Sequence, residues 1–328
     1  MLARWFKKLF KAKTASEQHT TAGQTTVSMQ ELLKLQQSAR TLSLNTGLKT
    51  RRQIVGGFSS GFKGRGIDFA EVRDYQLGDD IRHMDWRVTA RSGKPHTKLY
   101  EEEKECPVFI VVDYSPSMFF GSRQCFKSVV AAKAAALLAW AALQNRDRVG
   151  GLVFADNTHQ ELIPRPGLGG ILPFLKNLAD YSARLPEQND PQALTRTLDR
   201  LRHLTRPGSR IFLISDFKNL TEKAAHSVHH LAQHNEIRGV FIYDPLEKEL
   251  PPPNYYGISD GHQSLLIDTA NKALKQQYSA EFLTHYKRVQ HVVGRQKNQL
   301  LHLATTDNLR QCLAKQLLIT SPLETTYE

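Results

Sequence analysis

The chain has 328 residues, of which 40% are hydrophobic and 23% charged, and its formal net charge is +12 at pH 7. This composition is typical of a soluble globular protein of about two domains and excludes a disordered chain. The longest apolar run, residues 131–143, is interrupted by Lys133 and is shorter than the ~18 to 20 residues of a membrane-spanning helix. The positive charge predicts an anionic partner, such as nucleic acid, lipid headgroups or an acidic protein surface.

The first segment, residues 1–28, predicts a basic amphipathic helix and a linker. In residues 1–13 apolar side chains recur at helical spacing, with basic side chains on the other side. One interpretation is an anchor on an anionic membrane or a docking helix for a partner, and the other is a terminal helix packed on its own protein. Lysines interrupt the apolar residues, so no secretory signal is indicated, and the three cysteines lack metal-ligand spacing. We therefore expect a cytoplasmic protein, either free or peripheral to the inner membrane.

Residues 29–106 predict a short amphipathic helix over 29–42, followed by a small β-rich subdomain in which glycines separate short segments. Charged side chains of both signs crowd this subdomain. One interpretation is a partner-docking face in which guanidinium groups contact carboxylates. The other, which we favour, is an internal network of salt bridges and turns, with Trp86 anchoring the subdomain on the rest of the chain. The candidate docking residues are Arg73, Asp79, Asp80, Arg82, Asp85, Trp86 and Arg91.

Residues 107–320 predict an α/β domain with a doubly wound, mostly parallel sheet, followed by a tail at 321–328. Near-continuous apolar runs of strand length occupy residues 108–112, 151–154, 211–214 and 240–243, and helical stretches separate most of them. The stretch from Phe126 to Leu143 is apolar almost all round, which is typical of a buried helix. Alternation of strands and helices predicts helices on both faces of a parallel sheet.

An aspartate follows each predicted strand, namely Asp113, Asp156, Asp216 and Asp244. Ligands of open α/β sheets bind outside the carboxyl ends of the strands, so these acids are candidates for a cation site. For Asp156 and Asp244 we favour a role as a helix cap or in a turn. Asp113, Ser115, Ser117 and Asp216 together offer hard oxygen atoms that suit Mg²⁺, with Mn²⁺ or Ca²⁺ as alternatives. A carboxylate from a partner would complete the coordination.

The pattern Asp113-x-Ser115-x-Ser117, followed by Asp216, resembles the metal-ion-dependent adhesion site of von Willebrand factor A domains. The block from Gly64 to Arg91, which reads GRGIDFAEVRDYQLGDDIRHMDWRVTAR, resembles the signature of the bacterial domain-of-unknown-function family fifty-eight. Residues 244–251 and 303–307 are also similar to that family, so the resemblance extends from about residue 35 to 318. It implies an A-domain core, a MoxR-type AAA+ ATPase as partner, and a role in assembling other proteins or inserting their metal cofactors.

One departure from the adhesion-site pattern is a missing threonine in the loop of residues 187–194. Thr195 and Thr197 fall within the helix that follows, where we expect Asp190 to be the cap. Asp190 is a candidate substitute ligand. The alternative is a relict site whose Asp and Ser side chains only cap turns and helices.

The sequence thus predicts a non-enzymatic adaptor that works with a MoxR-type AAA+ ATPase on an unknown client protein. The main alternative is a basic protein that binds nucleic acid or an anionic membrane, although no nucleic-acid recognition module accompanies the charge. A Mg²⁺-dependent phosphatase would also place an aspartate after its first strand. Such an enzyme needs a second acid two residues later, where this chain has Ser115.

Overall fold

The computed structural model describes residues 25–44, 67–76, 79–102, 105–186, 189–259, 264–294 and 299–318. The predicted helix at residues 1–13, most of the predicted linker and the tail at 321–328 lie outside these ranges. The chain divides into a larger unit, residues 1–44 and 106–328, and a smaller unit, residues 45–105. Within the described ranges, no helix combines the length and apolar composition that crossing a bilayer requires.

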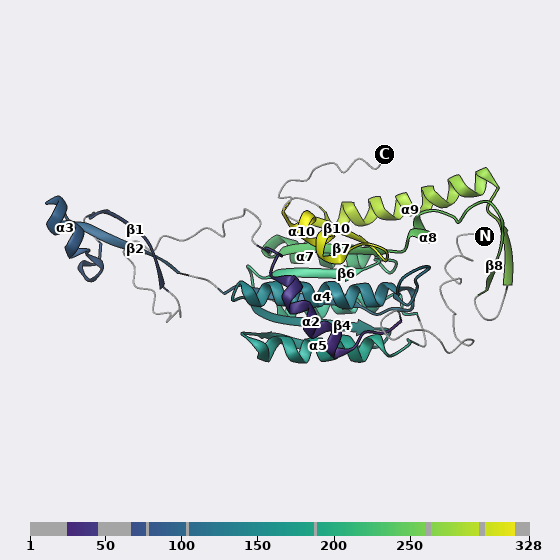
Figure 1. The fold of residues 1–328 in the computed structure, drawn as a ribbon, viewed down its shortest axis with the longest axis horizontal. Helices are drawn as coiled ribbons and strands as arrows, with labels where there is room; N and C mark the ends of the chain where they lie inside the picture. The colour runs from purple at the N-terminus through teal and green to yellow at the C-terminus, as the bar shows by residue number, and fades with distance from the viewer. Residues whose placement is uncertain are drawn as a thin grey trace. The chain divides into compact units, whose positions relative to one another are not determined.

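A six-stranded sheet in the order β10-β7-β6-β3-β4-β5 forms the centre of the larger unit (Figure 1). The strands are β3 (Pro107–Asp113), β4 (Arg148–Ala155), β5 (Thr158–Arg165), β6 (Arg210–Ser215), β7 (Glu236–Tyr243) and β10 (Gln299–Ala304). All neighbouring pairs are parallel except β4 and β5, which are antiparallel. The predicted doubly wound, mostly parallel sheet is therefore confirmed. The edge strands β5 and β10 were not predicted, because neither is a continuous apolar run.

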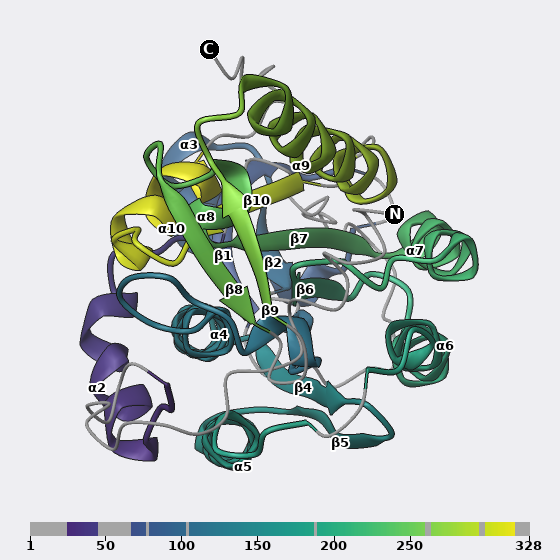
Figure 2. The same ribbon diagram turned by 90° about the vertical axis from the view of Figure 1, so that its right-hand side faces the viewer.

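Helices cover both faces of this sheet (Figure 2). One face carries α2 (Met29–Ala39), α4 (Lys127–Gln144), α5 (Leu168–Ser182) and α10 (Leu309–Leu318). The other face carries α6 (Ala193–Leu204), α7 (Glu222–His234) and α9 (Lys272–Val293). Because strand side chains alternate between faces, Val108 and Ile110 of β3 enter the first core, whereas Phe109 and Val111 enter the second. The short helix α8 (Pro245–Lys248) and the hairpin β8 (Tyr255–Ser259) with β9 (Ser264–Asp268) follow β7.

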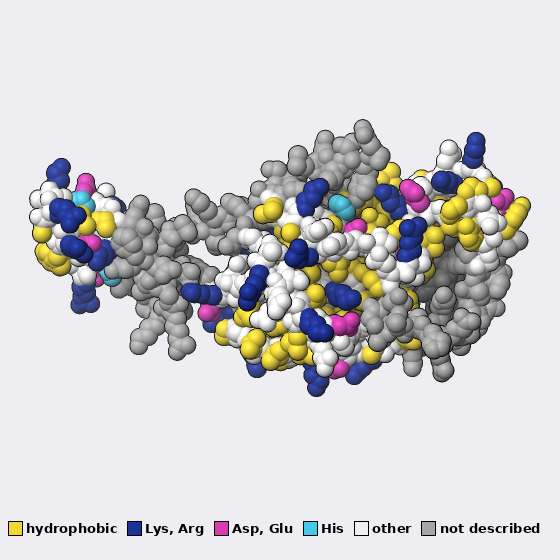
Figure 3. All heavy atoms as spheres, viewed as in Figure 1, with side chains coloured by type: hydrophobic (Ala, Val, Ile, Leu, Met, Phe, Trp, Pro, Cys, Tyr) yellow, Lys and Arg dark blue, Asp and Glu magenta, His cyan; other side chains and the backbone are white. Residues whose placement is uncertain are grey.

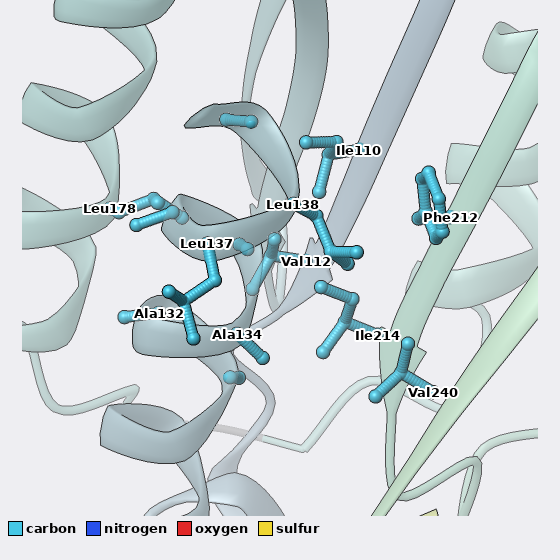
Figure 4. Close-up of a cluster of buried hydrophobic side chains, with 14 of the residues drawn as sticks. Ile110, Val112, Ala132, Ala134, Leu137, Leu138, Leu178, Phe212, Ile214 and Val240 are labelled. Carbon is cyan, nitrogen blue, oxygen red and sulfur yellow. The ribbon is translucent and has the colours of Figure 1, made fainter. Parts of the chain in front are cut away.

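The central helix α4 is buried nearly all round, as its apolar sequence predicted. Its side chains pack on the sheet, where Leu137 and Leu138 lie near Ile110, Val112 and Ile214 (Figure 4). Each leucine or isoleucine buried in this way stabilises the fold by about 1.5–3 kcal/mol. This packing fixes the amino-terminal end of α4 beside the carboxyl edge of the sheet, where the candidate site lies.

Helix α2 belongs to the larger unit, although it was predicted to form one part of the chain with the β-rich residues up to 106. A capping box between Ser28 and Glu31 starts the helix. The indole nitrogen of Trp140 in α4 donates to the carbonyl oxygen of Leu32 at 3.0 Å, and the Val27 amide donates to Ser182 Oγ at 3.1 Å. An amphipathic helix buries its apolar face against another apolar surface, and here the outer surfaces of α4 and α5 provide that surface for α2.

The smaller unit is an antiparallel pair of strands with two short helical segments between them. The strands are β1 (Ile67–Asp74) and β2 (His96–Glu102), and the helical segments are η1 (Ile81–His83) and α3 (Trp86–Ser92). The carboxylate of Asp85 caps α3 by accepting from the amides of Arg87 and Val88, and Gly93 ends it with a positive φ of 73°. Helix α3 was not predicted, because seven residues are too few to show helical periodicity.

Candidate functional site

The candidate site lies at the carboxyl edge of the sheet, where β3 and β6 run side by side. In chain order the six strands are arranged 3-2-1-4-5-6, which places the switch in strand order between β3 and β6. Asp113 ends β3, and Asp216 directly follows β6. Ligands of open α/β sheets bind beside such a switch point, because the connections leave the two strands toward opposite faces.

The carboxylate of Asp113 is buried and holds two segments together. Its Oδ1 accepts a hydrogen bond from the Ser115 amide at 2.7 Å, and its Oδ2 accepts one from Ser215 Oγ at 2.5 Å. Burial, together with the negative charge of Asp216, raises the pKa of Asp113 to about 6. The Asp113 oxygens are therefore committed to contacts inside the protein.

The two serines of the motif bring their hydroxyl groups to the same place. Ser115 Oγ and Ser117 Oγ lie 3.2 Å apart, and Ser117 is also hydrogen-bonded to the carboxylate of Asp216. The structure thus brings Asp113, Ser115 and Ser117 together with Asp216, which follows them by about a hundred positions in the sequence. The turn η2 (Pro116–Met118) shapes this loop.

A lysine outside the predicted motif lies against Asp216. Lys127, the first residue of α4, is fully buried, and its Nζ is 2.7 Å from Asp216 Oδ2 and 2.9 Å from Glu247 Oε1. Glu247, from α8, also accepts from Nζ of Lys218 at 2.7 Å. We call the four residues Lys127, Asp216, Lys218 and Glu247 the ion network.

The pKa values within the ion network follow from its charges. Burial alone would lower the pKa of Lys127, but the carboxylates of Asp216 and Glu247 raise it above its ordinary value. Burial would likewise raise the pKa of Asp216, but Lys127 and then Lys218 hold it well below its ordinary value. Desolvation by burial lowers the pKa of Lys218 itself. Lys127 and Asp216 are therefore a charged pair at neutral pH.

The oxygen atoms of the motif are of the kind that Mg²⁺ prefers, but the arrangement around them fits a divalent cation poorly. A metal ion bound at Asp216 would have to share this carboxylate with the Lys127 ammonium, and like charges at that separation repel. Among the residues that the structure describes, no three His, Cys, Asp or Glu side chains form a group that could hold a metal. The predicted metal ion stays a prediction, and the ion network is a competing arrangement.

The other predicted ligand, Asp190, is engaged elsewhere. Its Oδ1 accepts from the Gln192 amide at 2.8 Å, and its Oδ2 forms an ion pair with Arg196 in α6. It thus binds groups at the start of α6, which begins at Ala193 with Gln192 as its cap residue, whereas we had expected Asp190 to be the cap. Thr195 lies within α6, with its hydroxyl 3.0 Å from that of Thr221.

The two remaining strand-end acids have the structural roles that we favoured. Asp244 begins α8 in a capping box and also accepts from the hydroxyl groups of Ser122 and Thr305, the latter at 2.6 Å. Asp156 lies in the turn between β4 and β5. Neither belongs to the cluster around Asp113.

A cavity of about 520 Å³ opens beside the ion network. Its polar lining includes Ser117, Asp216, Lys218 and Glu247, whereas β7 and α9 supply aromatic side chains. The rings of Phe241 and Phe282 have centroids 6.1 Å apart, and His285 Nε2 lies 2.8 Å from the backbone oxygen of Asp216. Asp113 does not line the cavity. The cavity therefore combines a charged side with an aromatic one, which is typical of ligand-binding sites.

In the smaller unit, the acidic residues of the predicted docking face bind their own neighbours. Asp79 pairs with Arg73 at 2.7 Å, Asp80 caps η1, and Asp85 caps α3 and lies 3.6 Å from Lys98. The exposed members of the face are Asp80, Arg82, Trp86 and Arg91. Trp86 is 65% exposed, and its predicted anchoring role stays a prediction.

No sequence motif marked Lys127, Lys218 or Glu247 as a site residue. A weak signal was present for Lys127, because it is a charged residue at the start of a stretch that is otherwise apolar almost all round. Glu247 lay in the quoted block of residues 244–251, which carried a resemblance but no role. Lys127 contacts Asp216 and Glu247, which lie 89 and 120 positions away in the sequence, and the spacing of residues in a sequence does not predict contacts over such separations.

Comparisons with known proteins identify relatives over most of the chain. A family model described as "Protein of unknown function DUF58" matches residues 71–288. The chain is 27% identical over 274 residues to uncharacterized proteins of Mycobacterium bovis and Mycobacterium tuberculosis, covering 83% of this chain and 85% of each relative.

Solved structures give more distant likenesses. The hypothetical protein BatB from Bacteroides thetaiotaomicron is 14% identical with a TM-score of 0.40, and the match covers 65% of this chain and 97% of that protein. A von Willebrand factor type A structure from Catenulispora acidiphila is 13% identical with a TM-score of 0.33, covering 68% of this chain and 44% of that one.

Proposed function

The chain belongs to the DUF58 family of proteins of unknown function, so its role must be inferred from the site, and we propose that it is a non-enzymatic protein-interaction adaptor. In this proposal the cavity above β3 and β6 receives a segment of a partner protein. The observation that carries the proposal is the pairing of aromatic lining with the Lys218 ammonium in one cavity of about 520 Å³. Lys218 is 32% exposed, so its charge is within reach of a ligand, whereas Lys127 is fully enclosed.

The residues that line the cavity suit a partner segment in which an acidic residue lies next to an apolar one. A carboxylate would pair with Lys218 in a charge-assisted hydrogen bond. An adjacent apolar side chain would pack on the rings of Phe241, Phe282 and Tyr278, which line the same cavity. The resemblance of the sequence to its family supports a MoxR-type AAA+ ATPase as this partner, acting with the adaptor on a client protein.

A catalytic role has less support from the same residues. A phosphatase would need Asp113 as an accessible nucleophile, but both Asp113 oxygens accept hydrogen bonds from the protein and the residue is 2% exposed. The carboxylates of Asp216 and Glu247 are neutralised by lysines, so neither is placed as a general base. The adaptor interpretation requires no such group.

The smaller unit supports a second contact with an acidic partner surface. Asp79 and Asp85 are engaged by neighbouring groups of the same unit, whereas Arg82, Trp86, Arg87 and Arg91 are exposed. Figure 3 shows Lys and Arg side chains beside hydrophobic ones on this unit. Arginine and tryptophan are the residues that most often dominate binding at protein interfaces. We propose the acidic face of the same AAA+ ATPase as the occupant of this surface.

The experiment is a binding titration between the full chain and the MoxR-type AAA+ ATPase of the same organism. Lys218→Gln should weaken binding roughly tenfold or more, since a hydrogen bond to a charged group contributes about 1.5–3 kcal/mol. Lys218→Arg keeps the charge and should retain most of the affinity. The control is Lys176→Gln, an exposed lysine on α5 at the opposite face of the sheet.

Equal affinity for the wild type and Lys218→Gln would refute the cavity as the docking site. Replacing the ATPase by heparin or DNA in the same titration addresses the nucleic-acid alternative. Binding to DNA that is lost with Arg91→Ala but unaffected by Lys218→Gln would assign the smaller unit to nucleic acid instead.

A further inference from the structure

Lys127 puts a permanent positive charge where the sequence pattern predicts a divalent cation. Its ammonium lies 2.7 Å from Asp216 and 2.9 Å from Glu247, and its side chain is fully buried. Asp216 is also the acid that completes the cluster of Asp113, Ser115 and Ser117. Thus one carboxylate serves both the ion network and the predicted metal site.

The position of Lys127 is fixed by the fold. It is the first residue of α4, and the rest of α4 is packed between the sheet, α2 and α5. A buried ammonium is costly unless carboxylates and hydrogen bonds surround it, and removing it leaves buried carboxylates that are just as costly. The lysine and the two acids therefore depend on each other, in the way that a metal ion and its ligands do.

We infer that the Lys127 ammonium is the built-in counter-cation of this site, so that the site is charged and assembled without a divalent metal ion. A metal at Asp216 would displace the ammonium from that carboxylate or lie beside it, and both arrangements put two positive charges against one buried carboxylate. This inference goes beyond the proposed function, because it concerns what neutralises the site and holds whatever the cavity binds. Its consequence for the adaptor is that partner binding does not respond to divalent cations.

The deciding measurement is a titration of the full-length wild-type chain with Mn²⁺, followed by calorimetry and by electron paramagnetic resonance. We expect no stoichiometric binding and the same midpoint of thermal unfolding in chelator and in Mg²⁺. Binding of one Mn²⁺ per chain that disappears in Asp113→Ala would overturn the inference.

The variant Lys127→Met tests the counter-cation role by removing the ammonium. Removing the ammonium should lower the unfolding midpoint by roughly 10 °C in chelator, since a broken buried ion pair is strongly destabilising in a domain of this size. Mn²⁺ should restore part of that loss, because the variant exposes the carboxylates to a new cation. The control is Lys133→Met, a half-buried lysine on the same helix, which should change neither property.

An unfolding midpoint of Lys127→Met equal to that of the wild type in chelator would also overturn the inference. Where this variant does not fold, the wild-type Mn²⁺ titration decides alone. Partner binding separates the two proposals. If the wild type does not bind the ATPase in any buffer, the proposed adaptor function is refuted and the counter-cation role of Lys127 is unaffected. If the wild type binds Mn²⁺ stoichiometrically, the counter-cation role is refuted and the adaptor function is unaffected.

Discussion

Replacing Glu247 by glutamine is the most direct test of the ion network, because it removes one charge and almost no volume. Glu247 accepts from Lys127 at 2.9 Å and from Lys218 at 2.7 Å, and its side chain is 8% exposed. Breaking a buried ion pair by removing one partner costs about 3–5 kcal/mol of unfolding free energy. Lys127 keeps Asp216, and Lys218 can turn toward water, so we expect Glu247→Gln to cost about 3 kcal/mol at pH 7.

The pH dependence of this cost has a defined sign. Burial would raise the pKa of Glu247, but Lys127 and then Lys218 lower it below its ordinary value of 4.5. A lowered carboxyl pKa stabilises the folded state above the unfolded value, and this stabilisation is lost as the pH falls through the folded value. The difference between the wild type and Glu247→Gln should therefore be full at pH 7 and shrink only below about pH 4.5.

The assay is urea unfolding followed by tryptophan fluorescence at a series of pH values. The matched control is Glu249→Gln, two residues further along and exposed, which should cost less than about 0.5 kcal/mol. If Glu247→Gln costs no more than Glu249→Gln at pH 7, the network does not stabilise the fold and our reasoning fails. If the loss of unfolding free energy caused by Glu247→Gln does not shrink as the pH falls below about 4.5, the charge-based explanation is contradicted.

Other contacts give simpler expectations, all measurable by urea unfolding. Trp140→Phe removes the hydrogen bond to Leu32 and should cost about 1–2 kcal/mol, with faster amide exchange in α2; unchanged exchange would contradict the docking of that helix. Gly239→Ala would place a Cβ 2.6 Å from a side-chain carbon of α9, so it should cost about 1–3 kcal/mol, and a neutral effect would contradict this close packing. Asp244→Ala removes acceptors for Ser122, Thr305 and the start of α8, and should cost about 2 kcal/mol or more; a cost near zero would show that the cap is dispensable.

The sequence alone was enough to predict the four central strands of the sheet and the meeting of the residues at their carboxyl ends. Four continuous apolar runs indicated buried parallel strands, and β3, β4, β6 and β7 contain them. Once β3 and β6 are parallel neighbours, their carboxyl ends must meet at one edge. The cluster of Asp113, Ser115, Ser117 and Asp216 therefore follows from local pattern and chain topology.

Tertiary structure alone decided which charge lies beside Asp216. Periodicity shows which face of a helix is buried, but it does not show where the end of that helix points. Only the packing of α4 on the sheet carries Lys127 to Asp216, and only the loop after β7 adds Glu247. The docking of α2 on α4 was decided in the same way, because an apolar stripe in a sequence does not specify its partner. Local sequence thus determined the strands and the motif, whereas long-range packing determined the electrostatics of the site.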